Sequence, residues 1–127
     1  MKRSINLKKS VIDSILIYAK ANHPKESILL LKGKVYKHEI VVEEVEIPPL
    51  SVHGYNFSVI PLNKLPLDFS VVGIAHSHPS SILRPSIKDL NNFYGRIMVI
   101  TAFPYTEQDL AVFDRKGTQV KHSINGS

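Results

Sequence analysis

The stretch FSVVGIAHSHPSSILRPSIKDLNNFYG, residues 69–95, forms the centre of the predicted fold. Residues 69–75 are mostly apolar and β-branched and lead directly into His76-Ser77-His78-Pro79, which predicts a buried strand ending at a polar segment. A polar loop follows, and residues 86–94 predict a short helix that ends near Gly95. The stretch therefore predicts a strand, a loop and a helix, with chemically active side chains where the strand ends.

His76 and His78 are candidate metal ligands. Alternate residues of a strand share a face, so both imidazoles project from one side, where Val72 and Ile74 precede them. Asp89, one turn into the next predicted helix, can return its carboxylate to the strand end as a third ligand. Three protein ligands plus a water are typical of catalytic zinc sites, and four protein ligands of structural ones. The pattern predicts one zinc ion per chain, a metal that two histidines and an aspartate suit well.

Two further side chains could complete a hydrolytic site. Hydrolysis needs a group that moves protons, and Glu26 offers one, because it begins the apolar run 27–31, where a surface strand would not need a carboxylate. If this run forms a strand beside the histidine strand, Glu26 faces the reacting water. Ser86, three residues before Asp89, is placed to hydrogen-bond the water or the oxyanion of a tetrahedral intermediate.

Each of these residues also has a simpler interpretation. Ser86-x-x-Asp89 after a proline is a helix-capping pattern, although a capping serine can still aim its hydroxyl at a neighbouring metal. Paired histidines alone could equally be hydrogen-bonded core residues, and a lone glutamate at a strand end is usually a surface group. Taken together, the residues favour the metal interpretation, because chance rarely supplies this spacing. Ser77 points to the opposite face, where a structural hydrogen bond is expected.

The N-terminal part of the chain predicts an amphipathic helix. Its apolar side chains recur at three- and four-residue steps over residues 6–21, with Asn6 or Ser4 as the N-cap. Asn22-His23-Pro24 ends this helix, and His23 is expected to interact with its last carbonyl groups.

Strands account for most of the remaining chain. They are predicted at residues 27–31 (ending at Gly33), 34–47, 55–60, 97–102, 110–113 and 118–121, with a single helical turn at 61–66. This order of elements predicts an α/β (α+β) fold: a mixed sheet flanked by the N-terminal helix and the helix after the histidine strand. We expect one domain over residues 1–127, with a frayed tail at 123–127.

Composition narrows the function further. The 127 residues include no cysteine, which excludes disulfides, thiolate zinc sites and a cysteine nucleophile. The net charge is +5, and residues 1–37 carry nine lysines and arginines against two acids. That charge could steer an acidic partner, but no RNA-binding aromatic motif or basic recognition helix accompanies it, so no nucleic-acid partner is expected. No apolar run resembles a signal core or a membrane span, which favours a cytoplasmic protein without a membrane partner.

The chain resembles the JAMM zinc metalloproteases, also called the MPN-plus or JAB-domain family. Their signature is a distant Glu followed by His-[Ser/Thr]-His-x7-Ser-x2-Asp, and Glu26, His76-Ser77-His78, Ser86 and Asp89 match it with no departure in spacing. The context HPKESILLLKG, residues 23–33, matches as well, although its Leu29 stands where many members carry glycine. The resemblance spans nearly the whole chain and is strongest to the short archaeal members.

This resemblance implies a single MPN/JAB-like domain with one zinc ion on His76, His78 and Asp89. It implies that Glu26 is the general base and then the acid, and that Ser86 is the oxyanion donor. The implied activity is hydrolysis of the peptide or isopeptide bond after the C-terminus of a ubiquitin-like modifier with a Gly-Gly tail. Two alternatives stay open: a small-substrate amidase acting on a sulfur-carrier protein's tail, and a non-catalytic interaction module on the same fold.

Overall fold

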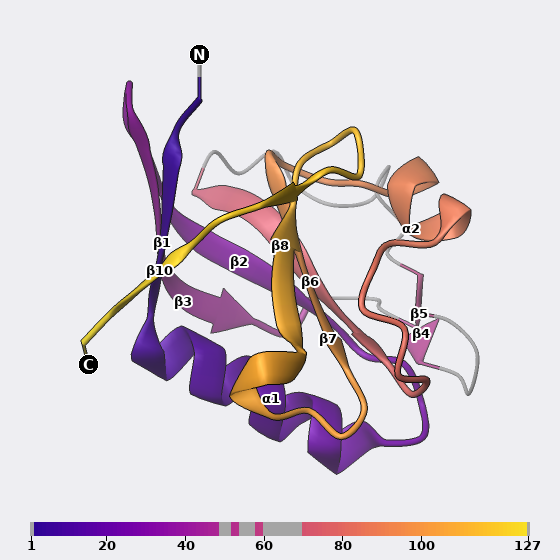
Figure 1. Ribbon diagram of the computed structural model, residues 1–127. Helices are drawn as coiled ribbons and strands as arrows, with labels where there is room; N and C mark the ends of the chain where they lie inside the picture. Colours follow the sequence, from indigo (N-terminus) through magenta and orange to yellow (C-terminus); the bar gives the residue numbers. More distant parts are fainter. Residues whose placement is uncertain (1, 49–51, 54–57, 60–69, 127) are drawn as a thin grey trace.

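The computed structural model describes residues 2–48, 52–53, 58–59 and 70–126, and Figure 1 shows a curved sheet with α1 along one face and α2 on the other side. The main sheet has eight strands in the order β10-β1-β3-β2-β6-β7-β8-β9. The strands of this sheet are β1 (Ser4–Lys8), β2 (Ile28–Val35), β3 (Glu39–Glu46), β6 (Val71–His78), β7 (Ile97–Ala102), β8 (Leu110–Phe113), β9 (Gln119–Val120) and β10 (Ser123–Asn125). The helices are α1 (Lys9–Asn22), α2 (Ile87–Asn91) and the 3-10 turn η2 (Glu107–Asp109).

The sheet is mixed. Strand β1 runs parallel to both β3 and β10, and β6 runs parallel to β7. The pairs β2–β3, β2–β6, β7–β8 and β8–β9 are antiparallel. The predicted α/β (α+β) architecture, a mixed sheet flanked by two helices, is therefore confirmed.

The sheet carries a hydrophobic core on each face. On one face, α1 buries its apolar stripe, including Val11, Ile15 and Ala19, against the strands. On the other face, Ile28 and Ile74 belong to a second cluster, against which the α2 region packs. Strands buried on both faces read as continuous apolar runs rather than alternating ones, and β7 has all its residues buried. This double burial explains why the central strands could be recognised from sequence.

The N-terminus differs from the prediction. The helix begins at Lys9, and neither Asn6 nor Ser4 caps it, because Ser4–Lys8 forms β1 instead. Within β1, Ile5 and Leu7 are buried and alternate with more exposed residues, which is the period of a strand. Strand β1 is paired on both sides, by β3 and β10, and these partners decide its conformation.

The first strand after α1 also continues further than predicted. Gly33 does not end it, because β2 runs on to Val35 and pairs with β3 through a register shift between Lys32 and Gly33. A Cβ atom at Gly33 would lie 1.8 Å from the Val41 carbonyl oxygen, so the bulge needs glycine for this close approach. The glycine therefore marks a bulge inside a hairpin arm rather than the end of a strand.

The predictions for α2 and for the C-terminal residues also differ from the structure. The helix predicted over 86–94 is shorter, covering only Ile87–Asn91. Residues 123–127 were expected to fray, but Ser123–Asn125 forms β10 and pairs with β1. A short polar tail gives no periodic signal for a strand that depends on a neighbour elsewhere in the chain.

One region lies mostly outside the described residues. Of the strand predicted over 55–60, the structure describes Ser58–Val59, which is β5 and pairs antiparallel with β4 (Val52–His53). The helical turn predicted over 61–66 lies outside the described residues.

Within the described ranges, neither α1 nor α2 has the length and apolar character needed to cross a membrane.

Candidate metal centre

Strand pairing brings Glu26 beside the histidine strand. Strands β2 and β6 run antiparallel, with Ile28 opposite His76. The contact continues just before β2, where the Ser77 N–H donates to the Ser27 carbonyl over 3.0 Å and the Ser27 N–H donates to Ser77 Oγ over 2.8 Å. The proposed role of Glu26 required its strand to lie beside the histidine strand, and the two strands are indeed neighbours. Continuing the same register by two residues places Glu26 beside His78.

His76, His78 and Asp89 meet where β6 ends. His78 Nε2 lies 2.9 Å from Asp89 Oδ2, and His76 Nδ1 lies 3.8 Å from Asp89 Oδ1. All three side chains are buried. His78 Nδ1 donates to the Ile82 carbonyl oxygen over 3.0 Å, which holds the ring against the loop between β6 and α2. The three candidate ligands thus come together in space.

Asp89 is held in the first turn of α2 by Ser86. The Ser86 hydroxyl oxygen accepts from the Asp89 N–H over 3.0 Å, and Asp89 Oδ2 accepts from the Ser86 N–H over 2.9 Å. This reciprocal capping box satisfies two N–H groups at the start of the helix. Since the hydroxyl acts as acceptor in the cap, its own hydrogen can still be donated elsewhere. Capping and catalysis are therefore compatible roles for Ser86.

The strand that carries the histidines contains a bulge that the sequence did not reveal. Leu31 pairs with Gly73, but Lys32 pairs with Val71, so Val72 is an extra residue on β6. Ile74 shares the apolar cluster of the α2 face, as predicted, whereas Val72 belongs to the cluster on the α1 face. The expectation that Val72 lies on the histidine face was wrong, because the bulge reverses the alternation before Ile74.

Glu26 and His76 both have shifted pKa values, and burial is the main cause for each. Burial raises the pKa of Glu26 to about 7, with a further rise from the negative charge of Asp89 and an opposing effect of His78. Burial lowers the pKa of His76 to about 4, against the charge of Asp89, so His76 is neutral at pH 7. A glutamate with a pKa near 7 suits proton transfer, and a neutral imidazole suits a metal ligand.

His78 and Asp89 form a hydrogen-bonded pair that shifts the pKa of both groups. Burial is the largest single effect on each pKa and opposes the charge of each group, but their mutual hydrogen bond and the other neighbouring interactions together outweigh it. Together with the bond to the Ile82 carbonyl, this interaction raises the pKa of His78. The same bond, the nearby His76 and the Ser86 N–H lower the pKa of Asp89 to about 2. The carboxylate is therefore ionised at neutral pH, as a metal ligand must be.

The donor set fits a divalent metal, although the donors contact one another directly. Among the described residues, no three His, Cys, Asp or Glu side chains are arranged as a metal-binding group, and His78 Nε2 and Asp89 Oδ2 are hydrogen-bonded to each other. Both ring nitrogens of His76 are buried without a hydrogen-bond partner in the described part of the chain. Buried polar atoms are rarely left unpaired, so these orphaned nitrogens indicate a ligand role. Two histidines and one carboxylate match the protein ligands of catalytic zinc.

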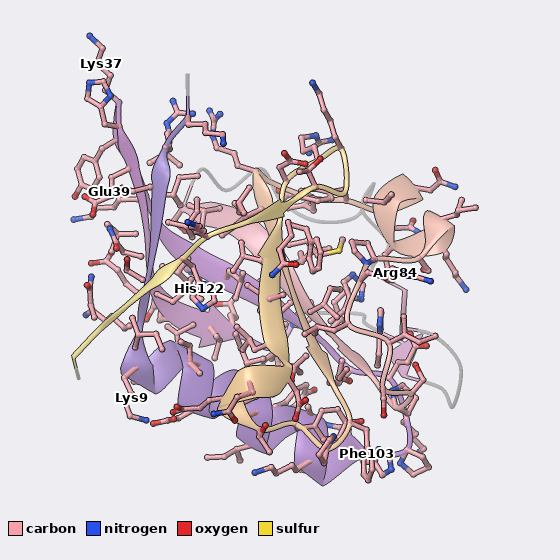
Figure 2. The ribbon with its side chains drawn as sticks, viewed as in Figure 1. Lys9, Lys37, Glu39, Arg84, Phe103 and His122 are labelled. Atoms are coloured by element: carbon pink, nitrogen blue, oxygen red, sulfur yellow. The ribbon has the colours of Figure 1, made fainter. Side chains whose placement is uncertain are left out.

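The structure also places the other residues that the sequence singled out. Ser77 shares its hydroxyl with Ser27 at 2.8 Å, which confirms the expected structural hydrogen bond on the opposite face. His23 does not bond the last helix carbonyls through its ring, since Nδ1 lies 2.8 Å from Tyr105 Oη, and only its backbone N–H caps the helix, at Ala19. Arg84 is exposed on the loop between β6 and α2 (Figure 2).

Sequence reasoning missed the aromatic residues next to Glu26. His23, Phe103 and Tyr105 pack their rings together, with Phe103 and Tyr105 supplied by the segment after β7. The only signal in the sequence was the short spacing between His23 and Glu26. Nothing local connects either residue to the segment after β7, because that contact depends on the tertiary fold.

Comparisons with known proteins agree with this site. The family described as prokaryotic homologs of the JAB domain matches residues 8–113. A "probable metalloprotease" from Haloferax volcanii is 33% identical over an alignment of 120 residues, and the match covers 89% of this chain and 74% of that protein. A JAB1/MPN domain protein from Archaeoglobus fulgidus superposes with a TM-score of 0.70 at 29% identity, covering 94% of this chain and 97% of the other. A structure described as "JAMM: A Metalloprotease-like Zinc Site in the Proteasome and Signalosome" has a TM-score of 0.69 at 28% identity, covering 96% and 98%.

The fold and the site together define a JAMM-type, metalloprotease-like domain. More particularly, this chain belongs to the family of prokaryotic homologs of the JAB domain, whose match covers most of its length. The resemblance stated from the sequence motif is thereby confirmed.

Proposed function

We propose that this protein is a zinc-dependent peptidase or isopeptidase that hydrolyses the bond after the C-terminus of a ubiquitin-like modifier. The observation that carries the proposal is the position of Glu26. It lies next to a His-His-Asp set whose donors fit zinc, and its pKa of about 7 suits a general base. The similarity to a probable metalloprotease supports the same reaction class.

His76, His78 and Asp89 are the residues that would hold the zinc ion. When bound, zinc would supply Lewis-acid chemistry, polarising a carbonyl group and lowering the pKa of water. The side chains already have suitable protonation states and orientation. His76 is neutral and Asp89 is ionised, and the hydrogen bond from His78 Nδ1 to the Ile82 carbonyl orients the His78 ring. The hydrogen bond between His78 and Asp89 would be replaced when a metal binds, while the bond to Ile82 would keep the His78 ring oriented.

Glu26 would move the proton. In its ionised form it takes a proton from the attacking water, and in its protonated form it returns that proton to the leaving amine. Ser86 would donate its hydroxyl hydrogen to the oxygen that becomes negative at the scissile carbon. Its place at the cap of α2 fixes this hydroxyl relative to Asp89.

The proposed substrate is a ubiquitin-like modifier, or its conjugates, with a Gly-Gly tail. The proposal for the modifier rests on the family to which the chain belongs and on the motif at Glu26, His76-Ser77-His78, Ser86 and Asp89.

The direct test compares the wild-type protein with Glu26→Gln on a linear fusion and an isopeptide conjugate of a ubiquitin-like protein, with added zinc. Glu44→Gln, an exposed change of the same kind on β3, is the matched control. We expect Glu26→Gln to lower the rate by about 10²–10⁴-fold at equal zinc content, and Glu44→Gln to cleave normally. Equal cleavage by the wild type and Glu26→Gln would rule out the general base, and cleavage unaffected by a chelator would rule out the metal.

Two further arms separate the alternative functions. Turnover of sulfur-carrier-protein tails and dipeptides, but not of protein conjugates, would identify a small-substrate amidase. Absence of turnover on every substrate, together with failure to bind about one equivalent of zinc, would identify an interaction module on this fold.

A further inference from the structure

An aromatic cluster joins the segment that carries Glu26 to the end of β7. We define this cluster as His23, Phe103 and Tyr105. His23 stacks on Phe103 with ring centroids 4.8 Å apart and an interplanar angle of 24°. His23 Nδ1 lies 2.8 Å from Tyr105 Oη, a hydrogen bond across 82 residues of chain. Phe103 meets Tyr105 edge to face, at 5.8 Å. The three rings therefore form one connected unit.

The same cluster is also bonded to the backbone of the strand that carries His78. The Phe103 N–H donates to the His78 carbonyl over 3.0 Å and to the Ser80 carbonyl over 3.2 Å. Phe103 thus follows directly on the parallel pairing of β6 and β7, where His78 lies opposite Ala102. Figure 2 shows Phe103 at the far end of the molecule from Lys37, which lies on the turn between β2 and β3. The segment after β7 therefore touches both the strand of a metal ligand and the ring of His23.

Tyr105 is held in an unusual backbone conformation at this point. It has a φ of 63°, in the left-handed region that residues other than glycine seldom adopt. Its N–H donates to the Ala102 carbonyl over 2.8 Å, and its side chain is almost completely buried. Burial raises the pKa of the Tyr105 hydroxyl, and the negative charge of Glu26 raises it further, so this hydroxyl lies within electrostatic range of that carboxylate. Conformations of this kind persist where the surroundings fix them, and they gather near functional sites.

We propose that His23 and Tyr105 are positioning residues that fix Glu26 relative to the metal centre. The inference rests on the proposed role of Glu26 as general base. His23 lies three residues before Glu26, in a segment where the Lys25 N–H also bonds the Asn22 carbonyl over 2.8 Å. On the other side, the Ser27 N–H bonds Ser77 Oγ. His23 and Ser27 therefore hold the two ends of the short segment that carries the base.

The physical reason for such a device is the sensitivity of proton transfer to geometry. A displacement of about 1 Å at a reacting group can cost about 10²-fold in rate. Glu26 precedes the first residue of β2, Ile28, by two positions. The His23–Tyr105 bond supplies a tie to a buried side chain on a different element.

The first experiment measures kcat and KM of the zinc-loaded protein. We expect His23→Ala to lower kcat by about 10- to 100-fold with KM changed by less than about twofold. Tyr105→Phe, which keeps the ring and removes only the hydroxyl, should give a smaller loss of the same kind. His23→Asn should recover most of kcat, because its amide can occupy the place of Nδ1. His38→Ala, an exposed histidine on the turn between β2 and β3, is the matched control and should leave kcat unchanged.

Two combinations distinguish positioning from packing. Tyr105→Phe added to His23→Ala should cause no further loss, since the two side chains share one bond. His23→Ala added to Glu26→Gln should also cause no further loss, because a residue that acts through Glu26 has no effect when the carboxylate is gone. A packing role would lower the residual rate of Glu26→Gln as well, and that result would overturn the inference.

A second readout needs neither metal nor substrate. In the metal-free protein, hydrogen exchange at the Lys25 and Ser27 amides should be about tenfold faster in His23→Ala than in the wild type, and unchanged in His38→Ala. Unchanged exchange in His23→Ala, or kcat within about twofold of the wild type for both His23→Ala and Tyr105→Phe, would overturn the inference while leaving the proposed function intact. If Glu26→Gln cleaved like the wild type, the proposed function would fail instead, and the exchange data would still show whether the cluster holds this segment.

Discussion

Asp89 Oδ2 accepts a hydrogen bond from His78 Nε2 over 2.9 Å, joining the first turn of α2 to the end of β6. The same oxygen accepts the Ser86 N–H, so one carboxylate serves both the helix cap and the candidate metal centre. A cap that orients a candidate ligand couples the stability of α2 to the geometry of the site.

Substitution of Ser86 should separate its two roles. Ser86→Ala removes both the cap and the hydroxyl donor, and should lower the free energy of unfolding by about 1 kcal/mol, whereas Ser86→Gly should lower it by only a few tenths. Both variants lack the hydroxyl, so both should lose about 10²–10³-fold in kcat. Urea unfolding and steady-state kinetics on the same preparations check this. If Ser86→Gly kept wild-type activity, the hydroxyl would serve only as a cap.

Zinc should stabilise the wild-type protein through Asp89. A ligand that binds only the folded state at 100 times its dissociation constant adds about 2.7 kcal/mol to the free energy of unfolding. Asp89→Asn should abolish this zinc-dependent gain, and Asp13→Asn, on the exposed Lys9–Asp13 pair of α1, should keep it. Thermal unfolding of each variant with zinc and with a chelator measures the difference. An equal gain in Asp89→Asn would place the metal elsewhere.

Glu26 and His76 should act in opposite directions on the pH dependence of metal-free stability. The pKa of Glu26 rises from its ordinary 4.5 to about 7, so the folded state retains a proton and stability is lost as the pH rises through that window. The pKa of His76 falls from 6.5 to about 4, so its contribution is present above pH 6.5 and is lost as the pH falls to 4. The two effects oppose each other in the wild type.

Single substitutions should expose each effect. In Glu26→Gln, the free energy of unfolding should decrease as the pH falls from 6.5 to 4. In His76→Gln, it should increase as the pH falls from 7 to 4.5. Burial also lowers the pKa of His122, but this contribution is common to both variants. Urea unfolding in the presence of a chelator gives the two slopes, and slopes of the same sign would contradict the assignment.

Thr101 offers a test of packing on the opposite face of the sheet. Its hydroxyl oxygen is fully buried on β7 without a hydrogen-bond partner in the described part of the chain. Thr101→Val keeps the shape and removes the unpaired polar group, so it should raise the free energy of unfolding by about 1 kcal/mol. Chemical denaturation measures the change, with Thr106→Val, at the exposed cap of η2, as a comparison that should destabilise. A loss of stability in Thr101→Val would mean that the hydroxyl has a partner.

Some elements could be predicted closely because they are buried on both faces. The strands at Ile97–Ala102 and Leu110–Phe113 have the predicted bounds, since a continuous apolar run between turns leaves little choice. Strand β1 could not be predicted from the sequence. Ser4–Lys8 directly precedes an amphipathic helix and is partly predicted as its start, whereas pairing with β3 and β10 makes this segment a strand. The bulge at Val72 was equally hidden, because it results from the register between β2 and β6.

By itself the sequence determined the identity of the candidate site. The two-residue spacing of His76 and His78, followed by Ser86 and Asp89 at helical spacing, specifies which side chains meet, because local backbone geometry brings them to one strand end. Only the tertiary structure decided that β2 lies beside β6, that Ser27 contacts Ser77 fifty residues away, and that His23 bonds Tyr105. Periodicity reports which face of an element is buried, whereas the choice of neighbouring strands depends on the packing of the whole sheet. For that reason the candidate ligands could be recognised from the sequence, and the surroundings of Glu26 could not.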